Sequence, residues 1–320
     1  MKKYSNRLYT VLLLLILQFA TVFSTSIAWA EGDWEKKASM SHARYGQGVE
    51  RLGNLIYSVG GEDDSERGYT ATVEAYDPAS NQWLKKADLP QPGVHLKTAV
   101  YHELLYVIAG YEPLTGTPIP VQYYDPGMDQ WTILPDVVLD IYDPAVTVWK
   151  GQVLISGGYH ASGVTLDTVF TFDPGTGKRE KVAAMPAPRF GHTAAIVNDR
   201  LMIAGGAPNA YGAVRPMSSV ISYDFTAQTW STIASMATPR MHPASVVIGG
   251  QWFVLGGGRQ EVLGDVYVPE VNGWSPVPAS ELGNRNQPGV ISLGESSLVL
   301  IGGYRDVPLS AVESIAWPAR

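Results

Sequence analysis

Short apolar runs, each ending in a pair of small residues, recur six times along the chain. The first run is Leu55–Val59, which leads into Gly60 and Gly61. The six pairs lie at 60–61, 109–110 (Ala-Gly), 157–158, 205–206, 256–257 and 302–303. The intervals between successive pairs are 49, 48, 48, 51 and 46 residues. A regular repeat of this length indicates that one structural unit is repeated through the chain.

Each pair is followed by a strand-like segment with an aromatic residue, and in most repeats a tryptophan lies seven positions further on. The matching pairs are Tyr76 and Trp83, Tyr124 and Trp131, Tyr223 and Trp230, and Tyr267 and Trp274. The third repeat has Phe172 and Arg179 instead. Short apolar segments bounded by turn residues predict four strands in each repeat, and no segment has the length and period of a helix.

The recurring di-glycine, tyrosine and tryptophan resemble kelch repeats, and the resemblance covers residues 31–320. It implies an all-β fold, a six-bladed kelch-type β-propeller. The glycines suit crowded strand ends, and the aromatics suit the space between blades. Tyr142, Asp143 and Trp149 imitate the aromatic spacing, but they precede Gly157 where an inner strand belongs. We read them as core and turn residues and expect no seventh blade.

The repeat also indicates how the ring closes. Trp34 has the place of an outer-strand tryptophan, although no inner strands precede it. At the other end Ile315 has the tyrosine position, so its tryptophan would fall at position 322, beyond the last residue. We therefore predict that the last blade is closed by the N-terminal strand, which would hide the exposed edges of an open sheet.

Residues 1–30 have the features of a cleavable signal peptide. Lys2, Lys3 and Arg7 precede an uncharged run over 8–23, and Ala28 and Ala30 form a small-x-small cleavage pattern. The run is shorter than the roughly 20 residues of a membrane-spanning helix. We expect a secreted or cell-envelope protein without a membrane span after cleavage, whose propeller occupies 31–320.

Composition narrows the function further. The 320 residues carry a net charge of −7 and include no cysteine. The absence of cysteine excludes disulfides, thiol catalysis and thiolate metal sites, and the acidic balance argues against nucleic-acid binding. The six histidines lack the close spacing of metal motifs, so we predict no metal site and no cofactor.

Arginines recur at the loops that lead into the inner strands. The four arginines at matching places are Arg44, Arg189, Arg240 and Arg285, and the loops after the glycine pairs add Arg259 and Arg305 with Tyr159 and Tyr304. A guanidinium offers paired donors to a carboxylate, so we predict an acidic-ligand site at the channel mouth. The alternative is structural, because kelch-like domains often use such an arginine to hydrogen-bond neighbouring loops.

Two functions of different classes follow. The first is a non-catalytic binding or scaffolding module for an acidic ligand, a glycan, a peptide or a protein partner, which is the use that kelch repeats mostly serve. The second is a sugar-modifying enzyme, because the exported six-bladed sialic acid epimerases are also similar in signal peptide, length and blade number. In that alternative Glu62 is the acid/base and Arg67 orients a sugar carboxylate. Kelch copper oxidases need a cysteine–tyrosine cross-link and are excluded. We favour the binding module.

Overall fold

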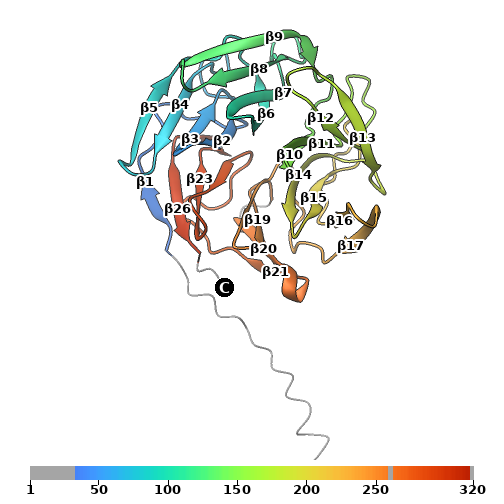
Figure 1. Ribbon diagram of the computed structural model, residues 1–320. Helices are drawn as coiled ribbons and strands as arrows, with labels where there is room; N and C mark the ends of the chain where they lie inside the picture. The colour runs from blue at the N-terminus through green and yellow to red at the C-terminus, as the bar shows by residue number, and fades with distance from the viewer. Residues whose placement is uncertain (1–32, 259–261, 318–320) are drawn as a thin grey trace, which may run out of the picture. The chain divides into compact units, whose positions relative to one another are not determined.

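The six repeats fold into six four-stranded antiparallel sheets arranged around a central channel (Figure 1). The computed structural model describes residues 33–258 and 262–317. Blades 1 to 3 consist of β2 (Gly48–Leu52), β3 (Leu55–Val59), β4 (Val73–Asp77) and β5 (Gln82–Lys86); β6 (Val94–Tyr101), β7 (Leu104–Tyr111), β8 (Pro120–Asp125) and β9 (Gln130–Val138); and β10 (Ala145–Trp149), β11 (Gln152–Ser156), β12 (Thr168–Phe172) and β13 (Arg179–Ala184). This confirms the all-β, six-bladed propeller.

The other three blades repeat the pattern. They consist of β14 (Phe190–Val197), β15 (Arg200–Ala207), β16 (Val220–Asp224) and β17 (Thr229–Ile233); β18 (Ala244–Ile248), β19 (Gln251–Leu255), β20 (Gly264–Val268) and β21 (Gly273–Pro276); and β22 (Gly289–Ser292), β23 (Ser297–Ile301), β26 (Val312–Ala316) and β1 (Glu35–Lys37). A short hairpin of β24 (Tyr304–Arg305) and β25 (Val307–Pro308) and one 3-10 turn, η1 (Pro269–Val271), complete the described residues. The described part of the chain has no helix long and apolar enough to cross a membrane.

The first strand of each blade lines the channel. These strands contact one another all the way round, from β2 to β6, β10, β14, β18 and β22 and back to β2. They begin one or four residues after the positions expected from the repeat, because the preceding residues form the turns of the channel mouth. Tyr142 and Asp143 belong to such a turn, and Trp149 ends β10, so the expectation of no seventh blade is confirmed.

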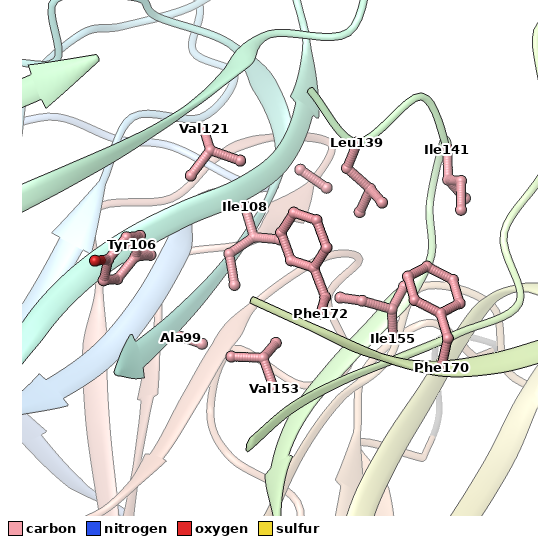
Figure 2. Close-up of a cluster of buried hydrophobic side chains, with 11 residues drawn as sticks. Ala99, Tyr106, Ile108, Val121, Leu139, Ile141, Val153, Ile155, Phe170 and Phe172 are labelled. Carbon is pink, nitrogen blue, oxygen red and sulfur yellow. The ribbon is translucent and has the colours of Figure 1, made fainter. Parts of the chain in front are cut away.

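The core lies between blades rather than inside one of them. Figure 2 shows the cluster between blades 2 and 3, where Ile108 of β7 packs beside Val153, Ile155 and Phe172 of the next blade. The second strand of each blade alternates its side chains between the two neighbouring interfaces, so nearly all of them are buried. Burial of apolar area on both faces of every sheet therefore holds the blades together.

Tryptophans on several outer strands join their blade to the one before it. The indole nitrogen of Trp83 donates to the carbonyl of Ala38, Trp131 to Ala87, and Trp274 to Ala234, at 2.7–2.9 Å. The third repeat lacks this tryptophan, and there Arg179 donates to the carbonyl of Val138 at 3.1 Å. The degenerate repeat thus keeps a link between its blades with a different donor.

The N-terminal strand closes the sixth blade as predicted. β1 pairs antiparallel with β26, with Glu35 opposite Ser314 and Lys37 opposite Val312. β26 in turn pairs with β23, so three C-terminal strands and one N-terminal strand share a sheet. The signal-peptide prediction concerns residues 1–30, which lie outside the described residues and stay a prediction.

Glycine pairs at the ends of the second strands fit tight crossings. Gly60 and Gly61 have φ of 55° and 101°, in the region that side chains with a Cβ rarely adopt. A Cβ at position 61 would lie 2.7 Å from the carbonyl oxygen of Tyr45. The glycines thus let the loops of one blade approach the turn that leads into its first strand.

Candidate functional site at the channel mouth

The four matching arginines are built into the blades. In each of them Nη1 donates to the carbonyl of the first glycine of its own repeat's pair; the pairs are Arg44 and Gly60, Arg189 and Gly205, Arg240 and Gly256, and Arg285 and Gly302, at 2.8–3.3 Å. The exposed fraction of all four side chains is 3% or less. They therefore tie the turn before the first strand to the end of the second strand.

Three of these arginines also pair with a buried carboxylate on the third strand of the same blade. Arg44 Nη2 lies 2.6 Å from Glu74, Arg240 Nη2 lies 2.9 Å from Asp265, and Arg285 contacts Glu313. Arg189 has Ser219 O at 3.5 Å, and burial lowers its pKa to about 10. A ligand at the mouth would not reach these guanidinium groups, and the alternative of a structural role fits this placement.

The remaining predicted residues are distributed around the same face. Tyr159 is half-buried, Tyr304 is 37% exposed, and Arg305 is exposed and donates to the carbonyl of Leu282. Arg67 is exposed on the β3–β4 loop. Arg259 falls outside the described residues.

One residue from each blade forms a ring at the channel mouth. These residues lie two positions after the arginine place in each repeat and all have a left-handed backbone; they are Gly46, His95, Asp143, Gly191, His242 and Gln287, with φ between 46° and 60°. Backbone bonds connect neighbours in this ring: Gly46 N donates to Gln287 O, Gly191 N to Asp143 O, and His242 N to Gly191 O. We call these six residues the mouth ring.

The side chains of the mouth ring converge on Asp143. His95 Nδ1 lies 2.6 Å from Asp143 Oδ1, and His242 Nε2 lies 3.3 Å from Asp143 Oδ2. On its other side His95 Nε2 lies 3.3 Å from Glu62 Oε1, while Tyr45 donates to Glu62 Oε2 at 2.7 Å. The predicted acid/base residue Glu62 thus belongs to a connected polar cluster at the mouth.

The charges in this cluster shift the pKa of its members. Burial alone would lower the pKa of His95, but the charge of Asp143 and hydrogen bonds to both carboxylates raise it to about 9. Burial alone would raise the pKa of Asp143, yet His95 and His242 hold it well below its usual range. The pKa of Tyr45 is raised by burial and by its bond to Glu62. The His95–Asp143 pair is consequently ionic at neutral pH.

Tyrosines surround the mouth ring as a rim. Tyr45 packs on Tyr304 with ring centroids 5.1 Å apart, Tyr111 on Tyr142 at 5.7 Å, and Tyr142 stacks on Tyr159 at 5.2 Å. Tyr211 continues the series from Tyr159 at 6.4 Å and is 64% exposed. We call Tyr45, Tyr111, Tyr142, Tyr159, Tyr211 and Tyr304 the tyrosine rim, which spans parts of five blades.

Below the mouth ring, a narrow cavity of about 120 Å³ enters the channel between His95, His242 and Gln287. Lys97 and His192 line it, and burial lowers the pKa of both, in His192 to well below the usual range. Deeper in the channel wall, burial raises the pKa of Glu50 to about 8, although a hydrogen bond from Thr98 opposes the shift. The channel therefore favours the uncharged forms of these groups.

A model of the Attractin/LZTR1 β-propeller family matches residues 18–267, more than three quarters of the chain. The chain belongs to the Attractin/LZTR1 β-propeller family. This family match and the six four-stranded blades confirm the resemblance to kelch repeats.

Relatives of this Attractin/LZTR1-type propeller include further kelch proteins. It is 26% identical to Kelch-like protein 36 of Mus musculus over 77% of this chain and 42% of the relative. It is 27% identical to Kelch-like protein terF of Aspergillus terreus over 70% of this chain and 52% of the relative. The chain spans about two fifths of the first relatives' length. A solved structure of YjhT superposes with a TM-score of 0.70 at 15% identity, covering 86% of this chain and 95% of YjhT, and shows the same fold.

Sequence reasoning missed the mouth ring of this Attractin/LZTR1-type propeller. His95 and His242 are too far apart in the sequence to form a recognisable metal motif, and the sequence pattern predicts only a turn at Asp143. A usable signal does exist, because all six ring residues share one offset from the arginine place. Aligning the repeats with one another would have brought the two histidines and the aspartate into one column.

Proposed function

We propose that this propeller is a non-catalytic binding module that holds a protein partner at the channel mouth. Kelch propellers generally bind proteins, which supports a binding role. The observation that carries the proposal is the tyrosine rim, in which half-buried rings pack on one another and the rings of Tyr211 and Tyr304 are exposed. Tyrosine is enriched in protein interfaces because it offers a large apolar face with a polar tip.

The most accessible rim residues lie on two separate loops. Tyr211 is on the β15–β16 loop of the fourth blade, and Tyr304 is the first residue of β24, in the sixth blade. Their rings are braced by Tyr159 and Tyr45 respectively, so little side-chain freedom is left to lose on binding. We propose that these two residues are the anchors of the partner.

We further propose that acidic groups of the partner pair with exposed arginines of the mouth loops. Arg67, Arg215 and Arg305 are exposed there. The four buried arginines take no part in this contact, since their donors are used inside the blades. The acidic segment 62–66 on the β3–β4 loop repels such groups, which would direct them toward Arg215 and Arg305. The partner is proposed to be met outside the cytoplasm, since residues 1–30 have the pattern of an export signal.

A second candidate function is the sugar-modifying enzyme of the epimerase type. The position of Glu62 favours it, because this carboxylate lies at the mouth between Tyr45 and His95. A carboxylate that contacts two proton-donating side chains can accept a proton from a substrate and return it, which is the role of an acid/base residue. Incubation with N-acetylneuraminic acid, followed by NMR of its anomers, tests this alternative. Turnover that disappears in Glu62→Gln would establish the enzyme and displace the binding module.

Affinity capture tests the binding module. The protein and its Tyr211→Ala, Tyr304→Ala and Met128→Ala variants are immobilised and exposed to the secreted and envelope fractions of the producing cells. Met128 is the matched control, since it is 68% exposed on the β8–β9 hairpin, at the other end of the sheets from the mouth. We expect one protein that the parent and Met128→Ala retain and that both tyrosine variants lose. A partner retained equally by all four, or binding only to acidic oligosaccharides on a glycan array, contradicts the proposal.

A further inference from the structure

Three metal-ligating side chains from three different blades meet at the mouth ring. Ligand atoms of His95, Asp143 and His242 all lie within 4.8 Å of one another, and two of the three pairs are at 2.6 and 3.3 Å. Two donors bound to one tetrahedral zinc ion at about 2.1 Å would be separated by about 3.4 Å. Small rotations of the side chains would therefore bring all three donors onto one ion.

The backbone at these positions makes the choice of residue informative. His95, Asp143 and His242 have φ of 54°, 46° and 52°, where glycine is free of strain and side chains are uncommon. The mouth ring does have glycine in two of its six positions, at 46 and 191. Residues held in such conformations concentrate at functional sites. The three ligand-type side chains thus occupy strained positions that point to one common centre.

Glycine at position 191 leaves the space that the imidazole of His242 occupies. A Cβ at position 191 would lie 2.6 Å from both Nε2 and Cδ2 of His242. Gly191 also accepts a hydrogen bond from the backbone nitrogen of His242 and donates one to Asp143. Through these contacts Gly191 fixes the imidazole of His242 beside the Asp143 carboxylate.

One buried nitrogen at this centre lacks a hydrogen bond. His242 Nε2 lies 3.3 Å from Asp143 Oδ2, but in poor hydrogen-bond geometry. A buried polar atom without a partner costs about 1–3 kcal/mol. A cation held by Asp143 and His242 would give this nitrogen a partner.

We propose that His95, Asp143 and His242 bind one divalent transition-metal ion, of which Zn²⁺ is the best match, with a coordination position open toward the mouth. The ion displaces the proton that His95 carries at neutral pH, and this proton is released to solvent. Two imidazoles and one carboxylate suit zinc and its neighbours in the first transition row and are poor ligands for Ca²⁺ or Mg²⁺. Glu62 lies beside Nε2 of His95, on the other side of the imidazole from Asp143, and its bond from Tyr45 holds it there, so that it orients the His95 ring rather than contacting the ion. This site does not depend on partner binding.

Calorimetric titration of ZnCl₂ into the purified, chelator-treated protein tests this site. We expect one strong zinc site per chain and a higher melting temperature in its presence. Asp143→Asn and His242→Ala should weaken zinc binding at least about tenfold, and Gly191→Ala should weaken it by displacing His242. Co²⁺ in place of Zn²⁺ should give visible absorption bands, which report the metal ligands independently of the calorimetric signal.

The control is His102→Ala, because His102 is an exposed histidine on the β6–β7 turn at the other end of the sheet. Its zinc affinity should equal that of the parent. Melting temperatures in EDTA show whether each variant remains folded. If a ligand variant does not fold, the Gly191→Ala variant takes its place, and the cobalt spectrum of the parent reports the ligands. No zinc binding by the parent, or binding that His242→Ala and Asp143→Asn retain, overturns the proposal.

Discussion

The indole nitrogen of Trp34 donates a hydrogen bond to the carbonyl oxygen of Pro278 at 2.9 Å, although 244 positions separate the two residues. The same bond joins Trp83 to Ala38 and Trp131 to Ala87 around the ring. Trp34 therefore links the sixth blade to the fifth in the way that Trp83 and Trp131 link their blades to the ones before them. The two ends of the propeller are joined both by strand pairing and by this side chain.

Trp34→Ala should lower the free energy of unfolding by about 2 kcal/mol, less than a fully buried tryptophan, since Trp34 is half-buried. Trp34→Phe should cost about 1 kcal/mol, the value of the lost hydrogen bond. Chemical denaturation measures both, and Lys36→Ala on the same strand is the control. Loss of β1 by deletion of 31–40 should destabilise the protein more than either change. Unchanged stability in the deletion would mean that β1 does not close the ring.

A buried ion pair gives the second prediction. Arg240→Leu should destabilise the protein by about 3–5 kcal/mol, because Asp265 is left charged and buried without its partner. Arg240→Leu combined with Asp265→Leu should recover much of this loss. The exposed Arg215→Leu is the reference and should change stability by about 0.5 kcal/mol or less. Near-wild-type melting of Arg240→Leu would argue that the arginine is available to ligands after all.

The third prediction concerns Glu50 and the pH dependence of the free energy of unfolding. Its pKa is raised from 4.5 to about 8 in the folded protein, mainly by burial. The folded state therefore favours the neutral acid. The contribution of neutral Glu50 to the free energy of unfolding is fully present below pH 4.5 and is lost as the pH rises to 8. Glu50→Gln should remove the dependence and be more stable than the parent above pH 8 by on the order of 2 kcal/mol. Parallel pH profiles of the two proteins would exclude this assignment.

The amino-acid sequence predicted the fold in detail and the site poorly, for physical reasons. A period near 50 residues and the place of Trp34 determine blade number and closure, because every blade must bury the same faces. The arginines were harder, since their partners Glu74, Asp265 and Glu313 lie two strands later and only packing shows that the pairs are enclosed. The cluster around Asp143 combines three blades, so no local pattern contains it.

Export is a prediction about residues 1–30. The basic start, the apolar run and the Ala28-x-Ala30 pattern predict cleavage before Glu31. Intact-mass spectrometry of the protein recovered outside the cytoplasm should show a chain that begins at Glu31. A mass that includes residues 1–30 would contradict cleavage, and replacing Ala28 and Ala30 by a bulky residue should block it.

Photo-crosslinking tests most directly whether the mouth is the binding surface. A photoreactive amino acid is placed at position 211 in one variant, at 304 in a second and at 128 in a third, and the partner is identified by mass spectrometry. Positions 211 and 304 are on exposed mouth loops, and position 128, on a hairpin at the far end of the sheets, is at least as accessible as either of them. We predict that one protein crosslinks from 211 and from 304 and does not crosslink from 128. Crosslinks that form from 128 and not from the two mouth positions would contradict the account.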